Sequence, residues 1–308
     1  MRKYYTRSLI RILSLLLIGC GTEAVADPVS PAGWTANLPL GASLPEGLYF
    51  VNEPYFLART GPHLAPGIRE VDGLVNIPVL LWSTPATLLG GHLEVAGFAP
   101  ALGLGINPGA TNGTSSSHVS IYNPAGLVGL AWSLGSGWSF VNWVGGFAPV
   151  STDIGNNIGL GGNFFTFVEI AALALNQDSW SLNANLIYLH SGSNLSTGIH
   201  QQPDTIDVDF AVVKHIEKFE IGLVGSATTD LTDTVRNRFG AARSSQVSLG
   251  GLVGYQFDTV NVEILATRSV AAAHQVAGGY DTRVYGRITI PLWNPAPAEQ
   301  AAVVKARY

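Results

Sequence analysis

The chain has 308 residues, a formal net charge of −5 and only 12% charged residues, against 47% hydrophobic residues and 36 glycines. An ordinary globular domain has about 25% charged residues, so this composition is unusual for a cytosolic protein. Lys and Arg form no basic tract or stripe, and the chain therefore lacks the electrostatic footprint of a nucleic-acid-binding protein. We expect no nucleic-acid partner.

Residues 1–26 have the organisation of an export signal. A basic region and a short apolar run precede a small-residue cleavage site: Arg2, Lys3, Arg7 and Arg11, then 12–18, then Ala24-Val25-Ala26. An alternative is lipidation of Cys20, because Leu17-Ile18-Gly19-Cys20 resembles a bacterial lipobox. Cys20 is the only cysteine, which excludes a disulfide framework. Both alternatives predict that the chain leaves the cytoplasm.

No stretch of 18 or more apolar residues follows Ala26. A transmembrane helix needs about 20 such residues, so the sequence excludes membrane-spanning helices. A closed β-barrel is the other structure that satisfies every backbone hydrogen bond in lipid. The sequence therefore predicts an all-β, antiparallel transmembrane barrel.

Residues 27–45 are rich in Pro and Gly. Two interpretations stay open for this segment. It is either a lead-in that lies in the periplasm or a plug that folds back into the barrel lumen. We assign residues 46–293 to the barrel and the Ala-rich residues 294–308 to a C-terminal tail.

The first half of the barrel region contains six extended stretches that are apolar on both faces: 48–59, 74–82, 92–104, 121–134, 138–150 and 163–175. Pro54, Pro78 and Pro124 lie within them, and proline inside a strand usually marks an edge or a bulge. The second half alternates apolar and polar residues with the period of a strand, over 180–190, 206–214, 219–228, 246–257, 260–267 and 283–293. The prediction is about twelve strands.

Short and long connections alternate between these stretches. The short ones are 135–137, 176–179, 217–218 and 258–259, and the long polar ones are 106–119, 151–162, 191–205, 230–244 and 272–279. Outer-membrane barrels have this pattern because their short turns face the periplasm and their long loops face outside. The pattern predicts localisation in the bacterial outer membrane, with membrane lipid as a partner.

Charged residues on the predicted strands should point into the lumen. On the lipid face at midplane, Lys or Arg costs about 2–4 kcal/mol and an acid somewhat less. This assigns five acids and two bases to the lumen: Glu94, Asp207, Asp209, Glu220 and Glu263, with Arg283 and Arg287. They form either a polar constriction that screens solutes or a salt-bridged filling. If they line one path, the excess carboxylates should repel anions.

The chain carries no recognisable catalytic motif, such as a zinc-protease, P-loop or G-x-S-x-G sequence. The histidines near serines or acids (His92, His118 and His190) are expected at loop rims. We therefore expect no enzyme activity, catalytic residue, cofactor or metal site. Aromatic residues near predicted strand ends are expected to form membrane-interface girdles, with solute binding as the alternative: Trp82, Trp132, Trp138, Trp143, Trp180, Tyr188, Phe219, Tyr255, Phe257 and Trp293.

Several stretches together resemble the family named for the meta-pathway of phenol degradation. They include Leu44-Pro45-Glu46-Gly47-Leu48-Tyr49, Asp207-Val208-Asp209-Phe210-Ala211 and the closing Tyr285-Gly286-Arg287-Ile288-Thr289-Ile290-Pro291-Leu292. The similarity extends over most of residues 44–293, although Phe164 and Phe165 stand where the family is expected to have Tyr-Trp. The resemblance implies an outer-membrane channel or transporter for small hydrophobic or aromatic compounds, and it transfers no ligand residues.

Two functions are therefore compatible with the sequence. The first is uptake of small hydrophobic solutes through the barrel. The alternative is a structural or stress-related barrel with no solute path. The sequence leaves open whether the lumen is plugged.

Overall fold

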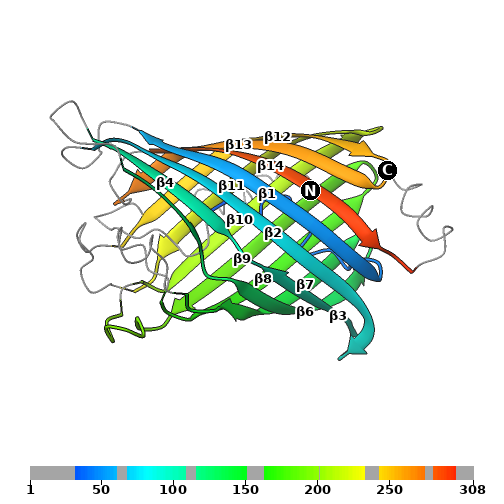
Figure 1. The fold of residues 1–308 in the computed structure, drawn as a ribbon. Helices are drawn as coiled ribbons and strands as arrows, with labels where there is room; N and C mark the ends of the chain where they lie inside the picture. The colour runs from blue at the N-terminus through cyan, green and yellow to red at the C-terminus, as the bar shows by residue number, and fades with distance from the viewer. Residues whose placement is uncertain are drawn as a thin grey trace, which may run out of the picture.

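A computed structural model describes residues 32–60, 68–108, 116–150, 163–200, 202–232, 243–274 and 280–295. The signal segment and Cys20 lie outside these ranges. Fourteen strand segments form one antiparallel sheet, and pairing of β1 with β2 closes the sheet into a barrel (Figure 1). The segments are β1 (Gly47–Thr60), β2 (Ile68–Leu88), β3 (Gly91–Phe98), β4 (Ala101–Pro108), β5 (Ser116–Ile121), β6 (Ala125–Gly135), β7 (Trp138–Phe147), β8 (Thr166–Gln177), β9 (Trp180–Ser191), β10 (Thr205–Ile216), β11 (Phe219–Asp230), β12 (Ser245–Phe257), β13 (Val260–Ala273) and β14 (Tyr280–Trp293).

The fourteen segments build twelve strands. β3 and β4 pair with successive parts of β2, so together they occupy one strand position. β6 pairs with β3 and β5 pairs with β4, so β5 and β6 together occupy the next strand position. The prediction of an antiparallel barrel with about twelve strands is confirmed.

Prolines lie beside the ends of strand segments in three neighbouring strand positions. Pro100 separates β3 from β4, Pro124 precedes β6, and Pro149 follows β7. Proline has no N–H to donate to a ladder. Backbone bonds of 2.8 Å still join the breaks, from Tyr122 N to the Pro100 oxygen and from Ala148 N to the Pro124 oxygen. The prediction of one continuous strand over 92–104 is therefore wrong.

The predicted long loop over 106–119 is also wrong at both ends. β4 continues to Pro108, and Ser116–Ile121 forms the short strand β5. The polar residues of β5 concealed its extended conformation, because the sequence between residues 106 and 119 has no clear period-2 alternation. Pairing with β4 supplies the partner that the local sequence could not reveal.

The short connections are two-residue hairpin turns at one end of the barrel, here called the short-turn end. Their first residues have positive φ angles between 48° and 56°: Leu89, Ser136, Asp178, Glu217 and Asp258. Positive φ in a two-residue loop matches the right-handed twist of the flanking strands. The longer connections join strands at the opposite end, here called the loop end. The predicted alternation is thus present.

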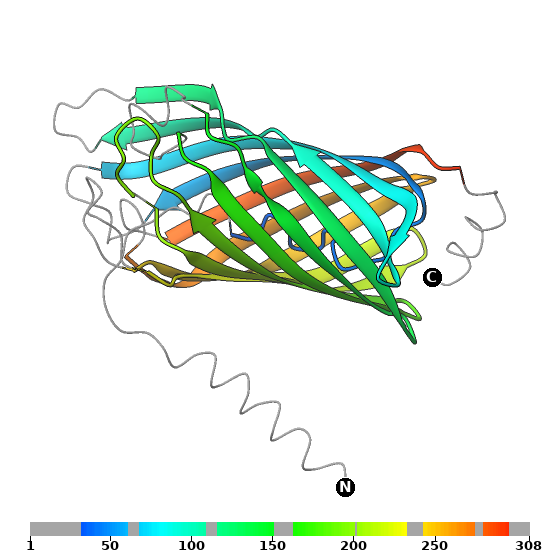
Figure 2. The ribbon, with the colours of Figure 1, turned by 90° about the horizontal axis from the view of Figure 1, so that it is seen from below.

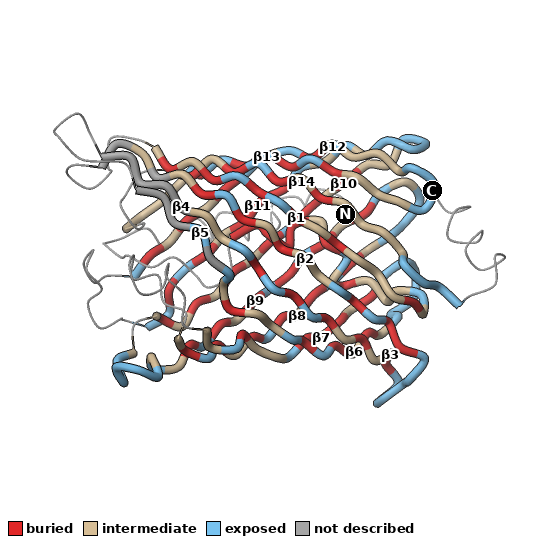
Figure 3. Tube along the Cα trace, in the orientation of Figure 1, coloured by how far each residue is buried: buried red, intermediate tan, exposed pale blue. Residues whose placement is uncertain are grey.

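Burial alternates along the strands, as Figure 3 shows. On β9, Asn185 and Ile187 are 1% exposed, whereas Leu186 between them is 47% exposed. Large apolar side chains point outward all around the barrel, for example Leu80, Val144, Phe210, Ile221, Val253 and Ile264. The molecule is therefore apolar outside and carries its charges inside. Within the described residues, no helix has the length and apolar character that a membrane span requires.

Several predicted girdle residues lie exposed near the short-turn end. They include Trp138, Trp180, Phe219, Phe257 and Trp293, and the rings of Phe219 and Tyr255 are 4.8 Å apart. Trp143 is an exception. It lies within β7, is 0% exposed and points into the barrel, so its assignment to a girdle was wrong.

Candidate functional site in the barrel lumen

Residues 32–44, here called the luminal segment, cross the inside of the barrel before β1 begins. Figure 2 shows this N-terminal stretch within the ring of strands. Trp34, Thr35 and Ala36 are at most 6% exposed, and their partners lie far away in the sequence. Gly33 has φ of 89°, and a Cβ there would lie 3.3 Å from the Tyr285 hydroxyl. The segment therefore passes close to the wall at this glycine.

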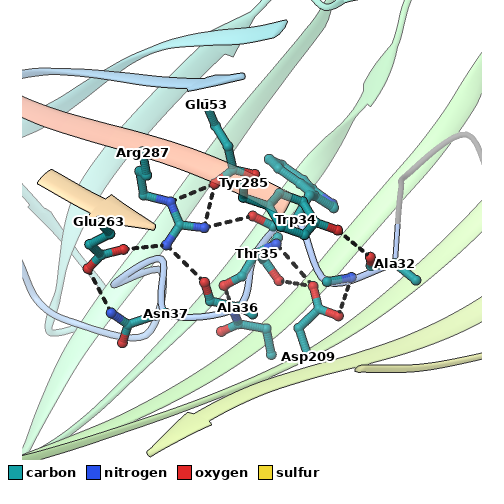
Figure 4. A network of polar contacts seen from close by, with 12 residues as sticks. Ala32, Trp34, Thr35, Ala36, Asn37, Glu53, Asp209, Glu263, Tyr285 and Arg287 are labelled. Atoms are coloured by element: carbon teal, nitrogen blue, oxygen red, sulfur yellow. Dashed lines mark hydrogen bonds and ion pairs between the residues drawn. The ribbon is translucent and has the colours of Figure 1, made fainter. Parts of the chain in front are cut away.

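Asp209 on β10 holds the first part of the luminal segment (Figure 4). Its carboxylate accepts hydrogen bonds from Gly33 N at 2.8 Å, Thr35 N at 3.0 Å and Thr35 Oγ1 at 2.6 Å. Across the lumen, Arg283 Nη1 and the Tyr285 hydroxyl both donate to the Ala32 carbonyl at 2.9 Å. Hydrogen bonds to a charged group are among the stronger ones, so these contacts fix the first part of the segment between β10 and β14.

Arg287 on β14 links two acids to the same segment (Figure 4). Its Nε donates to Glu53 Oε2 at 2.6 Å, and its Nη1 donates to Glu263 Oε2 at 2.9 Å. The guanidinium also donates to the carbonyls of Ala36 at 2.9 Å and Trp34 at 3.2 Å. A buried charge is tolerable when it is paired and hydrogen-bonded. Arg287 therefore pairs with both acids and with the backbone of the segment at the same time.

Amide and indole groups hold the middle of the luminal segment. Asn37 donates to Glu263 Oε1 at 2.8 Å and accepts from Asn183 at 3.0 Å. Trp143 on β7 donates its indole N–H to the Leu40 carbonyl at 2.9 Å. Trp143 thus has a structural partner inside the lumen, which accounts for its position away from the membrane interface.

Two side chains hold the end of the luminal segment. Glu94 on β3 accepts a hydrogen bond of 3.1 Å from Leu44 N. Ser83 on β2 donates to the Leu44 carbonyl at 3.0 Å. Ser83 and Glu94 are paired across β2 and β3, so both backbone groups of Leu44 are held at one place on the wall immediately before β1.

Five of the seven residues assigned to the lumen contact the luminal segment: Glu94, Asp209, Glu263, Arg283 and Arg287. Asp207, which is 1% exposed, instead accepts a hydrogen bond from Thr228. Glu220 lies near the short-turn end and accepts from Asn261 at 3.0 Å. The structure thus brings five of these residues to one bound segment and leaves two elsewhere on the wall.

Sequence reasoning missed other buried charges, including Glu53, Arg59 and Asp281. Arg59 Nε donates to Asp281 Oδ1 at 2.5 Å, and Arg283 donates to Asp281 Oδ2 at 2.7 Å. The predicted strand that contains Glu53 and Arg59 has apolar residues on both faces. Its sequence therefore shows no alternation that would place these two side chains inside the barrel. The cost of placing charge in lipid was the signal that could have found them.

The interior has two different sides, which we name by their side chains. The polar wall consists of the polar and charged interior residues of β10–β14, among them Asp207, Asp209, Ser226, Ser248, Glu263, Asp281, Arg283 and Arg287. Apolar residues such as Val213, Leu252 and Leu265 are buried on the same strands, nearer the short-turn end. The apolar wall consists of the apolar interior residues of β2, β3 and β6–β8, among them Ile77, Leu81, Phe98, Leu127, Val141, Trp143, Phe147, Val168 and Ile170. Trp34 packs on the apolar wall, with its ring centroid 5.5 Å from that of Phe98.

A serine, a histidine and a glutamate meet near the short-turn end. His215 Nε2 lies 3.1 Å from Ser181 Oγ, but His215 Nδ1 lies 3.5 Å from Glu220 Oε1. A nucleophilic relay needs hydrogen-bond contact at both steps, and 3.5 Å exceeds the usual range. His190 contacts Asp204 at 2.7 Å and is 55% exposed at the loop end. The contact of His215 with Glu220 is therefore longer than that with Ser181.

The closed barrel, its apolar exterior and its charged interior define the class of outer-membrane β-barrel proteins, and the chain is a bacterial outer-membrane protein. It belongs to the family described as "Putative MetA-pathway of phenol degradation", whose model matches residues 59–279. The family resemblance of the sequence is therefore confirmed. No curated protein matches the chain.

Among solved structures, the chain is similar to an outer membrane channel from Pseudomonas putida F1, at 14% identity and a TM-score of 0.67. That match covers 82% of this chain and 97% of the channel. A Pseudomonas aeruginosa FadL homologue matches at 9% identity and a TM-score of 0.46, covering 85% of this chain and 99% of the homologue. At these identities the likeness concerns the fold.

Proposed function

We propose that the chain is an outer-membrane channel for the uptake of small hydrophobic or aromatic compounds. The observation that carries this proposal is the apolar wall. A lumen that merely passed water and ions would have little reason to line one side with aliphatic and aromatic residues. Trp34, Phe98 and Phe147 form a contiguous aromatic group there, with successive centroid distances of 5.5 Å. Such surfaces bind apolar solutes by removing them from water.

The luminal segment is the plug of this channel in our proposal. Its contacts with Asp209, Arg287 and Glu94 reach both sides of the barrel. A channel of twelve strands is intermediate between filled eight-stranded barrels and wide porins. A short segment is therefore enough to close it. Passage would require the luminal segment to move.

We further propose that the short-turn end faces the periplasm, as in other outer-membrane barrels. An epitope tag inserted at Ser193, between β9 and β10, should be reachable by antibody on intact cells. A tag at Ser136, in the β6–β7 turn, should not be reachable until the outer membrane is permeabilised. Labelling in the opposite sense would reverse the assigned orientation.

Uptake of radiolabelled toluene by cells that express the chain tests the channel. Expression should raise initial uptake above that of cells carrying the empty vector. Val168→Asn on the apolar wall should lower this uptake several-fold, since it places an amide on the hydrophobic path. Ser248→Asn on the polar wall is the matched control and should leave uptake close to that of the wild type. Equal uptake with and without the protein would contradict the proposal.

A structural barrel with no solute path is the second candidate. The dense polar contacts of the luminal segment and the low exposure of the interior favour it. The two candidates differ for Asp209→Ala, which removes three hydrogen bonds to the segment. A plugged channel should gain conductance in planar bilayers after this change. Absence of conductance in both the wild type and the variant, together with absence of toluene uptake, would favour the structural barrel.

A further inference from the structure

The polar and apolar sides of the interior meet between β9 and β10, toward the loop end. In the strand register, Asp207 pairs with Ile187 and Thr205 pairs with Leu189. All four side chains are at most 2% exposed. Directly opposed residues on one face of a sheet have Cβ atoms about 4.5–5.5 Å apart. A carboxylate and a hydroxyl therefore lie beside two aliphatic side chains.

The polar members of this boundary have unused hydrogen-bonding capacity. Asp207 Oδ1 accepts from the Thr228 hydroxyl. Its other oxygen, Oδ2, is buried without a hydrogen-bond partner, and so is Thr205 Oγ1. Buried polar groups in proteins are nearly always paired, so two adjacent unpaired oxygens indicate a place that a bound molecule can satisfy.

The apolar members continue across the sheet. Ile187 pairs with Ile170 and Leu189 pairs with Val168 on β8. These four side chains are at most 3% exposed and form a continuous aliphatic surface next to the unpaired oxygens. Asp209, which holds the luminal segment, is two residues from Asp207 on the same face of β10. The boundary therefore adjoins the luminal segment on its loop-end side.

We propose that this boundary, formed by Thr205, Asp207, Val168, Ile170, Ile187 and Leu189, binds solutes that have an apolar body and one hydrogen-bond donor. This inference rests on the proposed channel function and names the solute class. A hydroxyl or amine of the solute donates to Asp207 Oδ2, and its ring or alkyl body lies on the aliphatic surface. Thr205 lies two residues, about 6.6 Å of strand rise, from Asp207, and its hydroxyl donates to the oxygen of the solute hydroxyl. A solute anion is disfavoured by the carboxylate.

Calorimetric titration of the full chain in detergent, with p-cresol and with 4-methylanisole, tests the site. The two probes have similar shapes, but only p-cresol has a hydroxyl donor. The wild type should bind p-cresol about tenfold more tightly, since one hydrogen bond is worth about one factor of ten. In Asp207→Asn the amide keeps one acceptor for Thr228 and replaces the free oxygen with a donor. p-Cresol and 4-methylanisole should then bind with about equal affinity.

Thr205→Val separates a binding role from a structural one. Valine has nearly the shape of threonine and removes a hydroxyl that has no partner. A purely structural hydroxyl predicts equal or higher stability and an unchanged affinity for p-cresol. A binding hydroxyl predicts equal or higher stability and a several-fold weaker affinity for p-cresol, because the donor to the solute oxygen is lost. Thr267→Val on β13 is the matched control, because Thr267 is also buried but lies three strands away, and it should keep the wild-type affinity.

The outcomes separate this inference from the channel function. Equal binding of both probes by the wild type would overturn the boundary site, as would an unchanged preference in Asp207→Asn or an unchanged affinity for p-cresol in Thr205→Val. The channel proposal would survive either result if expression still raised toluene uptake, since toluene has no donor. Failure of toluene uptake would overturn the channel function instead. Loss of preference in Asp207→Asn and weaker binding of p-cresol in Thr205→Val, with the control unchanged, would support the site.

Discussion

The polar wall and the apolar wall enclose the same lumen but stabilise it in different ways. On the polar wall, Arg287 and Asp209 are each held by several specific partners. On the apolar wall, Val141, Ile170 and Ala172 are 0% exposed and pack without polar contacts. Several charges of the lumen therefore hold the luminal segment, whereas the apolar wall is packed like the core of a soluble protein.

Arg287→Met should have the largest effect, because it leaves Glu53 and Glu263 buried without their cation. Removing one partner of a buried ion pair costs about 3–5 kcal/mol. We expect a loss of this size in the free energy of unfolding, measured by urea titration of the protein in lipid vesicles. Adding Glu53→Gln and Glu263→Gln to the variant should recover much of it. If Arg287→Met alone is nearly neutral, the polar wall does not depend on its ion pairs.

Ile170→Ala examines the apolar wall in the same assay. Ile170 is 0% exposed, and truncation of a buried Ile to Ala costs about 2–5 kcal/mol when the site cannot collapse. The volume-conserving Ile170→Leu should cost less than about 1.5 kcal/mol. Equal stability of Ile170→Ala and the wild type would show that the apolar wall is not packed as a core.

Asp209→Asn should weaken the attachment of the luminal segment without removing a wall residue. The charged acceptor is replaced by a neutral one, and a hydrogen bond to a charged group contributes about 1.5–3 kcal/mol. We expect more frequent open events in planar-bilayer recordings. Ser248→Ala serves as the control. Ser248 lies on the same wall, and its side chain contacts Gln246 and Ser269. Identical gating of the wild type and both variants would show that Asp209 does not contribute to closure of the channel.

The smallest effect concerns ion selectivity. Among the described buried residues, seven carboxylates face three arginines: Glu53, Glu94, Asp207, Asp209, Asp230, Glu263 and Asp281 against Arg59, Arg283 and Arg287. A lumen with excess carboxylates should prefer cations over anions. Reversal potentials in a salt gradient measure this preference. Glu220→Gln combined with Asp209→Asn should reduce it, whereas anion preference in the wild type would contradict the role of the acids.

The barrel and the inward or outward facing of most strands could be predicted from the sequence. Alternation along β9–β14 and the cost of charge in lipid assigned Asp207, Asp209, Glu263, Arg283 and Arg287 to the interior before any contact was known. The hairpin positions followed from short polar links such as Glu217-Lys218. These features depend on local pattern and on the solvent that each face meets, and both can be read from one stretch of chain.

The partners of the interior charges could not be predicted from the sequence. The sequence left residues 27–45 as either a lead-in or a plug, because hydrogen bonds such as Gly33 N to Asp209 join residues 176 positions apart. It also could not place Trp143 inside or divide β3 from β4, since these features depend on neighbours across the barrel. Asp207 and Ile187 are neighbours because of the register between β9 and β10. Contacts between distant segments are set by closure of the sheet, which no local pattern encodes.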